Sequence, residues 1–313
     1  MNESQFINKN LLILGGTGFI GSWAVKKGIK NGYKVSVLSR NIPEISEKIK
    51  NVDYIKADIS IYKDILKVIK FKKFTHVINL SGEINHANFK SSGRSVIENH
   101  FVGLLNLVSC LNRDCLKSFV QVGTSDEYGD SDAPQNEEQT CIPNSNYSLA
   151  KLSANNFLQM LNKTEKFPAI IVRLFLVYGP NQNTQRFLPQ VISSCLSDKT
   201  FPVSKGDQLR DFCFVEDIID GIFLALESKG LFGNIFNLAS GKQVKIRQMV
   251  EHIVKLTGKG NPVFGALPYR ENENMKLYAD VSKANNLLNW KATRDFDESL
   301  KKTIEYYHTN NAQ

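Results

Sequence analysis

The sequence predicts an α/β fold in which a doubly wound parallel sheet is followed by a smaller C-terminal lobe. Two observations support this expectation. Short apolar segments rich in β-branched residues alternate with helical patterns as far as residue 174, and a glycine-rich turn joins the first strand to the first helix. The chain of 313 residues is 42% hydrophobic, which is enough to build the core of one large domain or two.

The apolar periodicity places each element along the chain, and two later strands are expected to return to the main sheet. The predicted strands are Leu11–Leu14, Lys34–Leu38, Asp53–Ile55, His76–Leu80, Ser118–Val122, Ala169–Leu174, Phe212–Phe214 and Ile235–Leu238. The predicted long helices are Phe19–Asn31, Ile97–Asn112 and Ser148–Asn162. Turns become more frequent after Pro180, so we expect a cofactor domain at residues 1–173 plus about 211–240 and a substrate lobe at 174–210 plus about 241–313.

Composition excludes several classes of protein. The net charge is +8, but the 39 Lys and Arg residues are scattered, which favours a solvated surface or an anionic small substrate over nucleic acid. No apolar run approaches the roughly 18 residues of a membrane span, and the first ten residues lack the order of a signal peptide, so we expect a cytoplasmic protein. The five cysteines form no C-x-x-C pair, and we predict neither a disulfide framework nor a metal site.

A phosphate-binding turn is predicted where the first strand ends. The run LLILGGTGFIG places Gly15, Gly18 and Gly21 at three-residue spacing between strand and helix. In such a loop the first glycine makes the turn, the second lets the backbone approach a pyrophosphate, and the third lets the helix pack on the strand. A tight turn before any buried helix is the competing interpretation. The complete β-α-β unit around the motif favours a dinucleotide.

A second motif, Tyr147-Ser-Leu-Ala-Lys151, places a phenol and an ammonium on one face of a predicted helix. A nearby cation lowers the pKa of a tyrosine from about 10, so the phenol can exchange a proton with a substrate alcohol. Upstream, a predicted strand ends in Gly123-Thr-Ser-Asp-Glu-Tyr-Gly129. This brings hydroxyls and carboxylates to the rim of the sheet, where α/β proteins bind ligands.

Together these motifs resemble those of extended short-chain dehydrogenase/reductases of the nucleotide-sugar epimerase/dehydratase type, and the resemblance runs nearly end to end. It implies a Rossmann-type cofactor domain and a catalytic set of Thr124, Tyr147 and Lys151, with Tyr147 as the acid/base. The family's catalytic hydroxyl normally stands four residues before the tyrosine of a Tyr-Gly pair, here Tyr128-Gly129, so the resemblance favours Thr124, with Ser125 as the alternative. The resemblance also implies that Lys151 binds the nicotinamide ribose.

The cofactor is expected to be NADP(H), with NAD(H) as the alternative. Ser39 and Arg40 stand where an acidic residue would repel a 2′-phosphate, although Arg40 could equally stack on adenine. Asp58 matches an adenine contact in the family or, alternatively, caps the following helix. The residues expected to bind the cofactor are Gly15, Thr17, Gly18, Phe19, Ile20, Gly21, Ser39, Arg40, Asp58, Ile59, Leu80, Ser81, Gly82, Tyr147 and Lys151.

The substrate implied by the resemblance is a nucleotide-diphosphate sugar. Its expected contacts are Ser125, Asp126, Arg186, Arg210 and Arg270, with Arg210 near the nucleotide and Arg270 on the diphosphate. A guanidinium suits this task because its planar fork binds phosphate oxygens bidentately. A surface salt bridge is the alternative for the arginines.

The resemblance implies hydride transfer between the nicotinamide and carbon 4 of the sugar. The segments Phe201–Asp217 and Leu267–Met275 resemble those of 4-ketosugar reductases for surface polysaccharide synthesis, so a 4-ketosugar reductase or a sugar 4-dehydrogenase is expected. A 4-epimerase is the alternative. A 4,6-dehydratase ranks third because Asp126 is one methylene shorter than the glutamate of one dehydratase branch, and Glu127 stands at an apolar position of the family. A silent dinucleotide sensor ranks last, since Tyr147 and Lys151 are both present.

One departure from the family and one assembly prediction concern the long helices. His100 stands three residues before Gly103, where many relatives carry Asn, and Asn99 precedes it. A packing role for His100 is favoured over a catalytic one. The family commonly dimerises through these helices, so a homodimer is expected, although the same apolar side chains could face the sheet instead. They are Phe101, Leu104, Leu105, Val108, Phe157 and Leu161.

Overall fold

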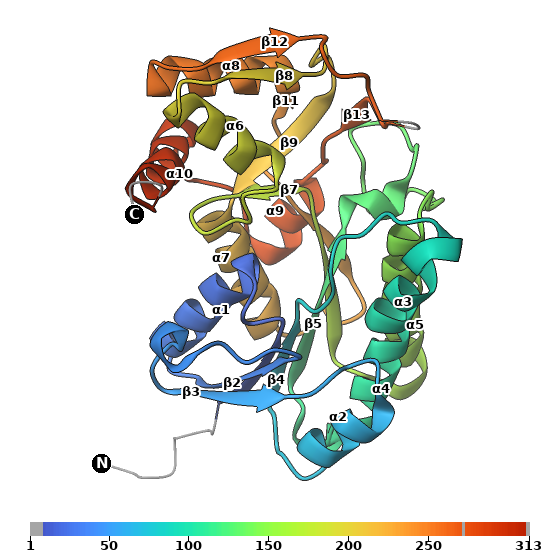
Figure 1. Ribbon diagram of the computed structural model, residues 1–313. Coiled ribbons are helices and arrows are strands. Elements are labelled where there is room, and N and C mark those ends of the chain that lie inside the picture. Colours follow the sequence, from blue (N-terminus) through green and yellow to red (C-terminus); the bar gives the residue numbers. More distant parts are fainter. Residues whose placement is uncertain (1–8, 271–272, 311–313) are drawn as a thin grey trace. The chain divides into compact units, whose positions relative to one another are not determined.

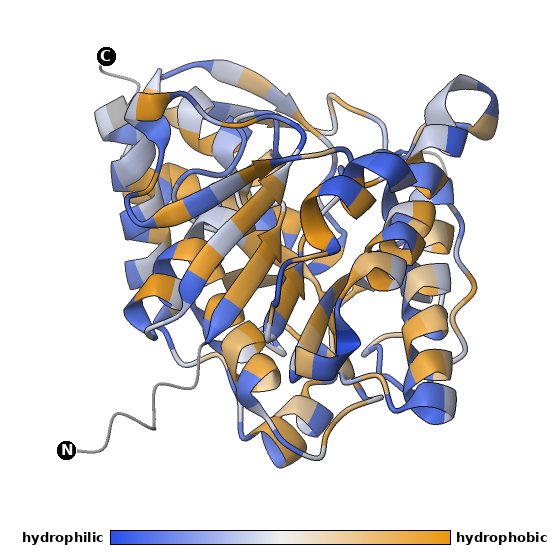
Figure 2. Cartoon of the chain, turned by 90° about the horizontal axis from the view of Figure 1, so that it is seen from below, coloured by the Kyte–Doolittle hydropathy of each residue, from blue (hydrophilic) through white to orange (hydrophobic). Residues whose placement is uncertain are grey.

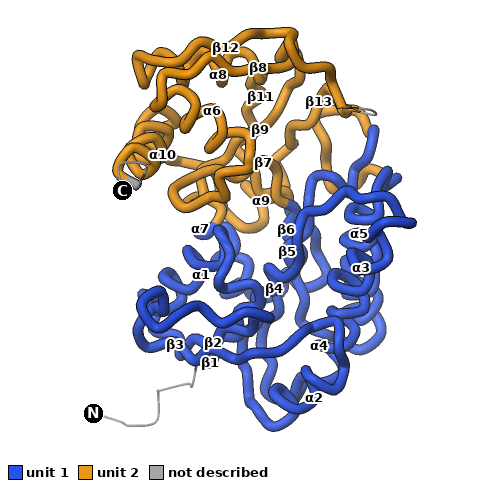
Figure 3. The backbone as a smooth tube through the Cα atoms, viewed as in Figure 1, with its two compact units in different colours: residues 1–130, 140–173, 219–236 blue, residues 131–139, 174–218, 237–313 orange. Residues whose placement is uncertain are grey.

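The computed structural model describes residues 9–270 and 273–310, which belong to two compact units (Figure 3). Unit 1 comprises Met1–Asp130, Thr140–Arg173 and Ile219–Phe236. Unit 2 comprises Ser131–Gln139, Leu174–Ile218 and Asn237–Gln313. The predicted domains had assigned 131–139 and 211–218 to the cofactor domain, whereas both segments pack within unit 2.

Unit 1 is built on a seven-stranded sheet, which confirms the predicted α/β fold (Figure 1). Its strands are β1 (Asn10–Leu14), β2 (Lys34–Ser39), β3 (Val52–Lys56), β4 (His76–Asn79), β5 (Ser118–Thr124), β6 (Ala169–Leu174) and β10 (Ile235–Leu238). They lie in the order β10-β6-β5-β4-β1-β2-β3, with β1 parallel to both β2 and β4. The direction of winding reverses between β1 and β4. Ligands of such folds bind beyond the carboxyl ends of the strands at this reversal.

Helices pack on both faces of the sheet because successive side chains of each strand alternate between the faces. Leu12 and Leu14 of β1 belong to a buried cluster with side chains of α2, α4 and α5, whereas Leu11 lies against Gly28 of α1. The strands are accordingly mostly hydrophobic in Figure 2. In the part of the chain that is described, no helix is long and apolar enough to span a membrane. The helices are α1 (Phe19–Lys30), α2 (Tyr62–Ile69), α3 (Arg94–Ile97), α4 (Gly103–Cys110), α5 (Asn146–Glu165) and α7 (Val215–Glu227).

The helix predicted at Ile97–Asn112 is a composite. It begins with a π-helical turn, η3 (Phe89–Gly93), continues through α3, passes a second π turn, η4 (Glu98–Val102), and ends with α4. A π turn holds an additional residue, so it changes which side chains face inward compared with an uninterrupted α-helix. One inward side chain is that of His100, which is 4% exposed.

Unit 2 contains smaller sheets, and one of them corrects a prediction. Phe212–Phe214 does not return to the main sheet: it belongs to β9 (Leu209–Phe214), which pairs with β7 (Leu176–Tyr178), β11 (Gln243–Lys245) and β13 (Lys276–Leu277). The buried carboxylate of Asp211 holds β9 there by accepting hydrogen bonds from Ser240 and Gly241. Ile235–Leu238, in contrast, joins the main sheet as predicted. The other elements are β8 (Thr200–Val203), β12 (Asn261–Phe264), α6 (Phe187–Leu196), α8 (Ile246–Thr257), α9 (Ser282–Leu288) and α10 (Phe296–Asn310).

Candidate active site in unit 1

The glycine loop after β1 has the backbone geometry that the sequence motif predicts. Gly15 has a φ of +73°, and a Cβ there would lie 2.7 Å from the carbonyl oxygen of Leu80. A Cβ on Gly21 would lie 2.0 Å from the oxygen of Gly15, so only glycine lets α1 approach the turn this closely. Gly18 is the N-cap of α1, and the first turn carries no acidic side chain. The N–H groups there are suited to an anion.

A cavity of about 290 Å³ lies beside this loop at the point where the sheet reverses. Most of the predicted cofactor residues contribute to its wall, together with five that the sequence analysis did not assign: Leu38, Asn41, Ala57, Glu83 and Asn99. Leu38, Asn41, Ala57 and Glu83 each adjoin a predicted position, so extending each motif by a residue would have found them. Asn99 lies in η4, next to no predicted cofactor residue, so no motif in the sequence indicated it. The lining is Gly15, Thr17, Gly18, Leu38, Ser39, Arg40, Asn41, Ala57, Ile59, Leu80, Ser81, Gly82, Glu83 and Asn99.

Six predicted cofactor residues lie outside this lining, namely Phe19, Ile20, Gly21, Asp58, Tyr147 and Lys151. Phe19 and Ile20 open α1 directly after Gly18. Asp58 lines a second cavity, of about 390 Å³, that shares Arg40 with the first. Its Oδ1 accepts hydrogen bonds from the backbone N–H (2.9 Å) and hydroxyl (2.7 Å) of Ser60, just before α2. These bonds form a local turn ahead of the helix and do not cap it, because the N-cap of α2 is Ile61 and has no side-chain hydrogen bond.

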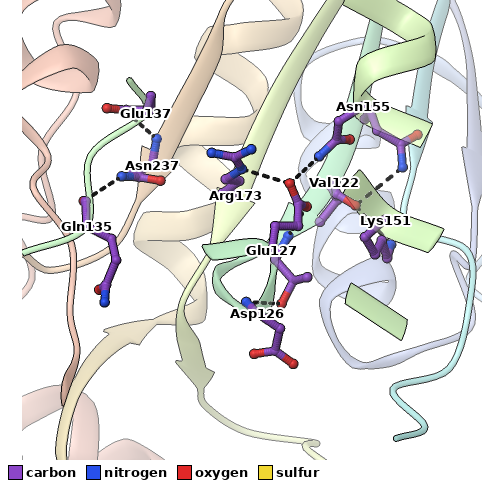
Figure 4. A network of polar contacts seen from close by, with 11 residues as sticks. Val122, Asp126, Glu127, Gln135, Glu137, Lys151, Asn155, Arg173 and Asn237 are labelled. Carbon is purple, nitrogen blue, oxygen red and sulfur yellow. Dashed lines mark hydrogen bonds and ion pairs between the residues drawn. The ribbon is translucent and has the colours of Figure 1, made fainter. Parts of the chain in front are cut away.

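Tyr147 and Lys151 lie on the buried face of α5. The helix is fixed by a reciprocal cap in which Ser145 Oγ accepts from Ser148 N and Ser148 Oγ accepts from Ser145 N, both at 3.1 Å. Lys151 Nζ donates to the carbonyl oxygen of Val122 on β5 at 2.9 Å (Figure 4). Burial lowers the pKa of Lys151 to about 8, although the Glu127 carboxylate opposes this shift. At physiological pH Lys151 is therefore still mostly an ammonium, but it loses its proton more readily than an exposed lysine.

Thr124 ends β5, two residues beyond the carbonyl that Lys151 binds. Its hydroxyl oxygen accepts a hydrogen bond from Asp126 N at 3.3 Å. That bond uses a lone pair, so the hydroxyl hydrogen can still be donated to a substrate oxygen. Ser125 is 3% exposed, and the partly exposed carboxylate of Asp126 lies 3.6 Å from Nε2 of His86.

Glu127 is a structural carboxylate. It is fully buried and accepts hydrogen bonds from Thr124 N at 2.9 Å, Asn155 Nδ2 at 2.7 Å and Arg173 Nε at 2.8 Å (Figure 4). Burial alone would lower the pKa of Arg173, but the Glu127 carboxylate raises it above its ordinary value. A side chain engaged in this way cannot reach a sugar. Glu127 is therefore no candidate for the acid of a dehydratase.

Two imidazoles flank the ring of Tyr147. The ring centroid of His86 lies 5.5 Å from that of Tyr147, and that of His100 lies 5.1 Å away, both in edge contacts. Neither contact followed from the sequence. His86 belongs to the segment after β4. The one feature of the sequence that could have indicated it is its position just beyond the end of a strand, at the ligand-binding rim of the sheet. His100 faces Tyr147 because of the π turn η4.

The three arginines predicted to bind substrate lie in unit 2. Arg210 is on β9, is 8% exposed and forms an ion pair with Glu273. Arg186 is the N-cap residue of α6, and both Arg186 and Arg270 are exposed. Glu271 and Asn272, which follow Arg270, lie outside the described residues.

Comparisons with known proteins agree with this geometry. The model of the NAD dependent epimerase/dehydratase family matches residues 11–239. A trifunctional UDP-glucose 4,6-dehydratase/UDP-4-keto-6-deoxy-D-glucose 3,5-epimerase/UDP-4-keto-L-rhamnose-reductase of Arabidopsis thaliana is 25% identical over 99% of the chain and 49% of its own length. The chain thus spans about half the length of the first curated relatives it matches.

Two further relatives match over nearly their whole length. The dTDP-glucose 4,6-dehydratase of Salmonella typhimurium is 26% identical over 96% of the chain and 93% of the relative. The UDP-glucuronic acid 4-epimerase of Bacillus cereus, solved in complex with UDP-glucuronic acid and NAD, is 26% identical and superimposes with a TM-score of 0.87, covering 96% of this chain and 99% of that one. With its glycine loop, its Tyr147–Lys151 pair and the family match, this chain belongs to the NAD dependent epimerase/dehydratase family, enzymes of the extended short-chain dehydrogenase/reductase type.

Proposed function

We propose that the chain is a cytoplasmic oxidoreductase that moves hydride between a nicotinamide dinucleotide and carbon 4 of a nucleotide-diphosphate sugar, as a 4-ketosugar reductase or a sugar 4-dehydrogenase. The observation that carries the proposal is the buried pair of Tyr147 and Lys151 on α5, with Lys151 tied to β5 beside Thr124. A proton-transfer group and a cation to stabilise its anion are the minimum that alcohol–ketone interconversion needs from the protein. The dinucleotide supplies the hydride chemistry when bound.

Each member of the catalytic set has a distinct role in this proposal. Tyr147 gives a proton to the carbonyl oxygen during reduction and takes it back during oxidation. Lys151 stabilises the phenolate of Tyr147 and binds the nicotinamide ribose. Thr124 donates its hydroxyl hydrogen to the same substrate oxygen. The residues proposed to hold the dinucleotide line the cavity beside Gly15, and its wall of glycines and hydroxyls suits a pyrophosphate and a ribose.

NADP(H) is the proposed cofactor. Arg40 contributes to both cavities, and the second also contains Lys56 and Lys67. Lys56 ends β3 directly beside Ser39 of β2 in the sheet register, so two cations follow these neighbouring strand ends. Such a pair favours a 2′-phosphate over the two free hydroxyls of NAD. The relative of known structure from Bacillus cereus binds NAD, and NAD(H) is therefore the competing cofactor.

A 4-epimerase is the second candidate. It is favoured by the similarity to the UDP-glucuronic acid 4-epimerase, which extends over nearly the whole of both chains. Mass spectrometry of the purified protein separates the two candidates. A tightly retained NAD(H) supports the epimerase, and an empty protein that takes up NADPH supports the reductase. Turnover on a panel of GDP-, CDP-, UDP- and dTDP-linked sugars then identifies the substrate.

The catalytic assignment is tested with Tyr147→Phe. We expect kcat to fall about 100- to 10,000-fold, because the proton donor is lost while the aromatic ring remains. Dinucleotide affinity, measured by fluorescence titration, should change little. Tyr62→Phe is the matched control, since Tyr62 is on α2 and is 46% exposed. Full turnover by Tyr147→Phe would refute the assignment.

The cofactor assignment is tested with Arg40→Ser. The ratio of kcat/KM for NADPH to that for NADH should fall about 10-fold or more, since a charged partner of the 2′-phosphate is removed. Lys30→Ser, at the far end of α1, is the control for a change in net charge. An unchanged ratio would show that Arg40 does not recognise the phosphate.

A further inference from the structure

His100 is held in one tautomer. Its Nε2 lies 3.0 Å from the backbone oxygen of Glu83, and a carbonyl oxygen can only accept, so Nε2 carries the hydrogen. Burial, reinforced by the Lys151 ammonium, lowers the pKa of His100 to about 3. The ring is therefore neutral at physiological pH, and its Nδ1 carries a lone pair.

That lone pair has no donor among the described residues, although Nδ1 is fully buried. A buried acceptor without a partner is costly, and native structures seldom keep one unless something outside the chain satisfies it. Replacing the imidazole by an apolar ring would avoid the cost. The unpartnered lone pair on Nδ1 thus indicates that a bound ligand supplies the hydrogen-bond donor.

The surroundings of Nδ1 indicate where that donor comes from. A Cβ on Gly82 would lie 2.2 Å from Nδ1 and 1.8 Å from Cε1, so this edge of the imidazole lies directly against Gly82. Gly82 lines the cavity proposed for the dinucleotide, and so does Asn99, the neighbour of His100 in η4. The opposite contact of the ring is the edge-on packing against Tyr147. One imidazole therefore connects the wall of the cofactor cavity to the proposed acid/base.

We propose that His100 is a positioning residue whose Nδ1 accepts a hydrogen bond from the bound dinucleotide and whose ring thereby fixes Tyr147 for proton transfer. The expected effect of His100 on turnover rests on the proposed function. The hydrogen bond to the dinucleotide can be measured by binding alone. The charged and titratable groups that face the ring are Lys151 and Tyr147, both from α5. In the loop after β4, the backbone oxygen of Glu83 accepts the hydrogen bond that Nε2 donates.

Three substitutions separate the functions of the ring. In His100→Asn the side-chain amide lies near the position of Nδ1 and keeps an acceptor there. In His100→Gln the amide reaches the position of Nε2 and keeps the donor to Glu83. His100→Phe keeps only the aromatic ring. We expect the Gln and Phe variants to bind NADPH about 3- to 10-fold more weakly and to lower kcat about 10-fold or more, with little change in KM for the sugar. His100→Asn should keep both values within about 3-fold of wild type.

Stability measurements separate positioning from packing. His100→Phe removes the unpartnered buried nitrogen, so it should unfold at the same urea concentration as wild type or a higher one while turning over more slowly. His76→Asn is the matched control: this histidine is also partly buried in unit 1, at the start of β4, and burial lowers its pKa to about 4. It should leave NADPH affinity and kcat unchanged.

Two results would overturn the inference. Equal NADPH affinity in the Asn, Gln and Phe variants would show that the dinucleotide does not supply the donor. Activity that follows stability across the three variants would show that His100 is a packing residue. If wild type turned over no sugar in the panel, the proposed function would fail, whereas a weaker binding of NADPH by the Phe variant would still support the contact.

Discussion

Two buried cations in unit 1, Arg173 and Lys151, differ in whether a carboxylate contacts them directly. Arg173 on β6 donates from Nε to the Glu127 carboxylate at 2.8 Å, and its guanidinium also lies 4.6 Å from the ring centre of Tyr128. Lys151 on α5 donates to the uncharged carbonyl of Val122 and feels Glu127 only through space. The pKa of Arg173 is raised by its carboxylate, whereas that of Lys151 is lowered to about 8 by burial.

The difference distinguishes a charge used for structure from one used for chemistry. Arg173 is paired so directly that its proton is held more tightly than in water, and the pair joins β6 to the turn after β5. Lys151 donates a hydrogen bond to a carbonyl oxygen but forms no contact ion pair with a described residue, so its positive charge can stabilise a phenolate or an anionic ligand. A carboxylate placed directly on Lys151 would satisfy the charge and weaken that response.

The largest expected effect comes from removing the partner of Arg173. Glu127→Gln should lower the free energy of unfolding by about 3–5 kcal/mol, because a buried guanidinium is left without its counter-ion. The double variant Glu127→Leu/Arg173→Leu should be more stable than the single one, and urea unfolding measures both. Glu165→Gln, in an exposed pair with Arg113, is the control and should cost less than about 1 kcal/mol. A similarly small loss in Glu127→Gln would contradict the structural role.

The second effect concerns pH and Lys151. Below pH 8 the lysine is protonated in both states, so folding carries the full cost of burying the ammonium. Between about pH 8 and the unfolded value near 10.4, the unfolded chain binds more protons, and stability from this group rises with pH. Relative to Lys151→Met, wild type should therefore gain about 3 kcal/mol between pH 7.5 and 10.5. Urea unfolding at both pH values tests this, with Lys163→Met, an exposed position of α5, as the matched variant. If the difference in unfolding free energy between wild type and Lys151→Met did not change with pH, burial would not lower the pKa of Lys151.

The smallest effect is expected at Asn155, which donates to the shared carboxylate Glu127 at 2.7 Å. Asn155→Ala should cost about 1–3 kcal/mol of stability, the range for losing one partner of a buried hydrogen bond. Turnover should stay close to wild type, because Arg173 still neutralises Glu127. Large loss of kcat with modest loss of stability would show that the two cations are coupled more closely than their contacts indicate.

Local rules explain what was predictable from the sequence. The β-α-β unit, the glycine loop and the Tyr147–Lys151 face each depend on residues within a few positions of one another, and the structure has all three. The hydrogen bonds of Asp58 are local too, since both donors belong to Ser60, two residues further along the chain. In each case a short-range steric or hydrogen-bonding preference determines the conformation.

The features that escaped prediction depend on distant partners. Phe212–Phe214 has the apolar character of a core strand, but β9 pairs with β7, β11 and β13, and Asp211 binds Ser240 and Gly241, all far from it in the sequence. The buried carboxylate of Glu127, in the turn after β5, is explained only by its ion pair with Arg173 on β6. The direction of His100 depends on a π turn, for which helical periodicity gives no signal.

The serine cap of α5 determines where insertions and deletions can occur without rotating Tyr147 and Lys151. Ser145 and Ser148 define the first turn of the helix by contacts within that turn alone, so the rotational phase of Tyr147 and Lys151 is set locally. Insertions or deletions in the segment before Ser145 can then be absorbed by the loop without rotating either side chain away from β5. An insertion after Ser145 would turn both by about 100° per residue. An insertion before Ser145 should therefore preserve the orientation of Tyr147 and Lys151, whereas one between Ser145 and Tyr147 should destroy it.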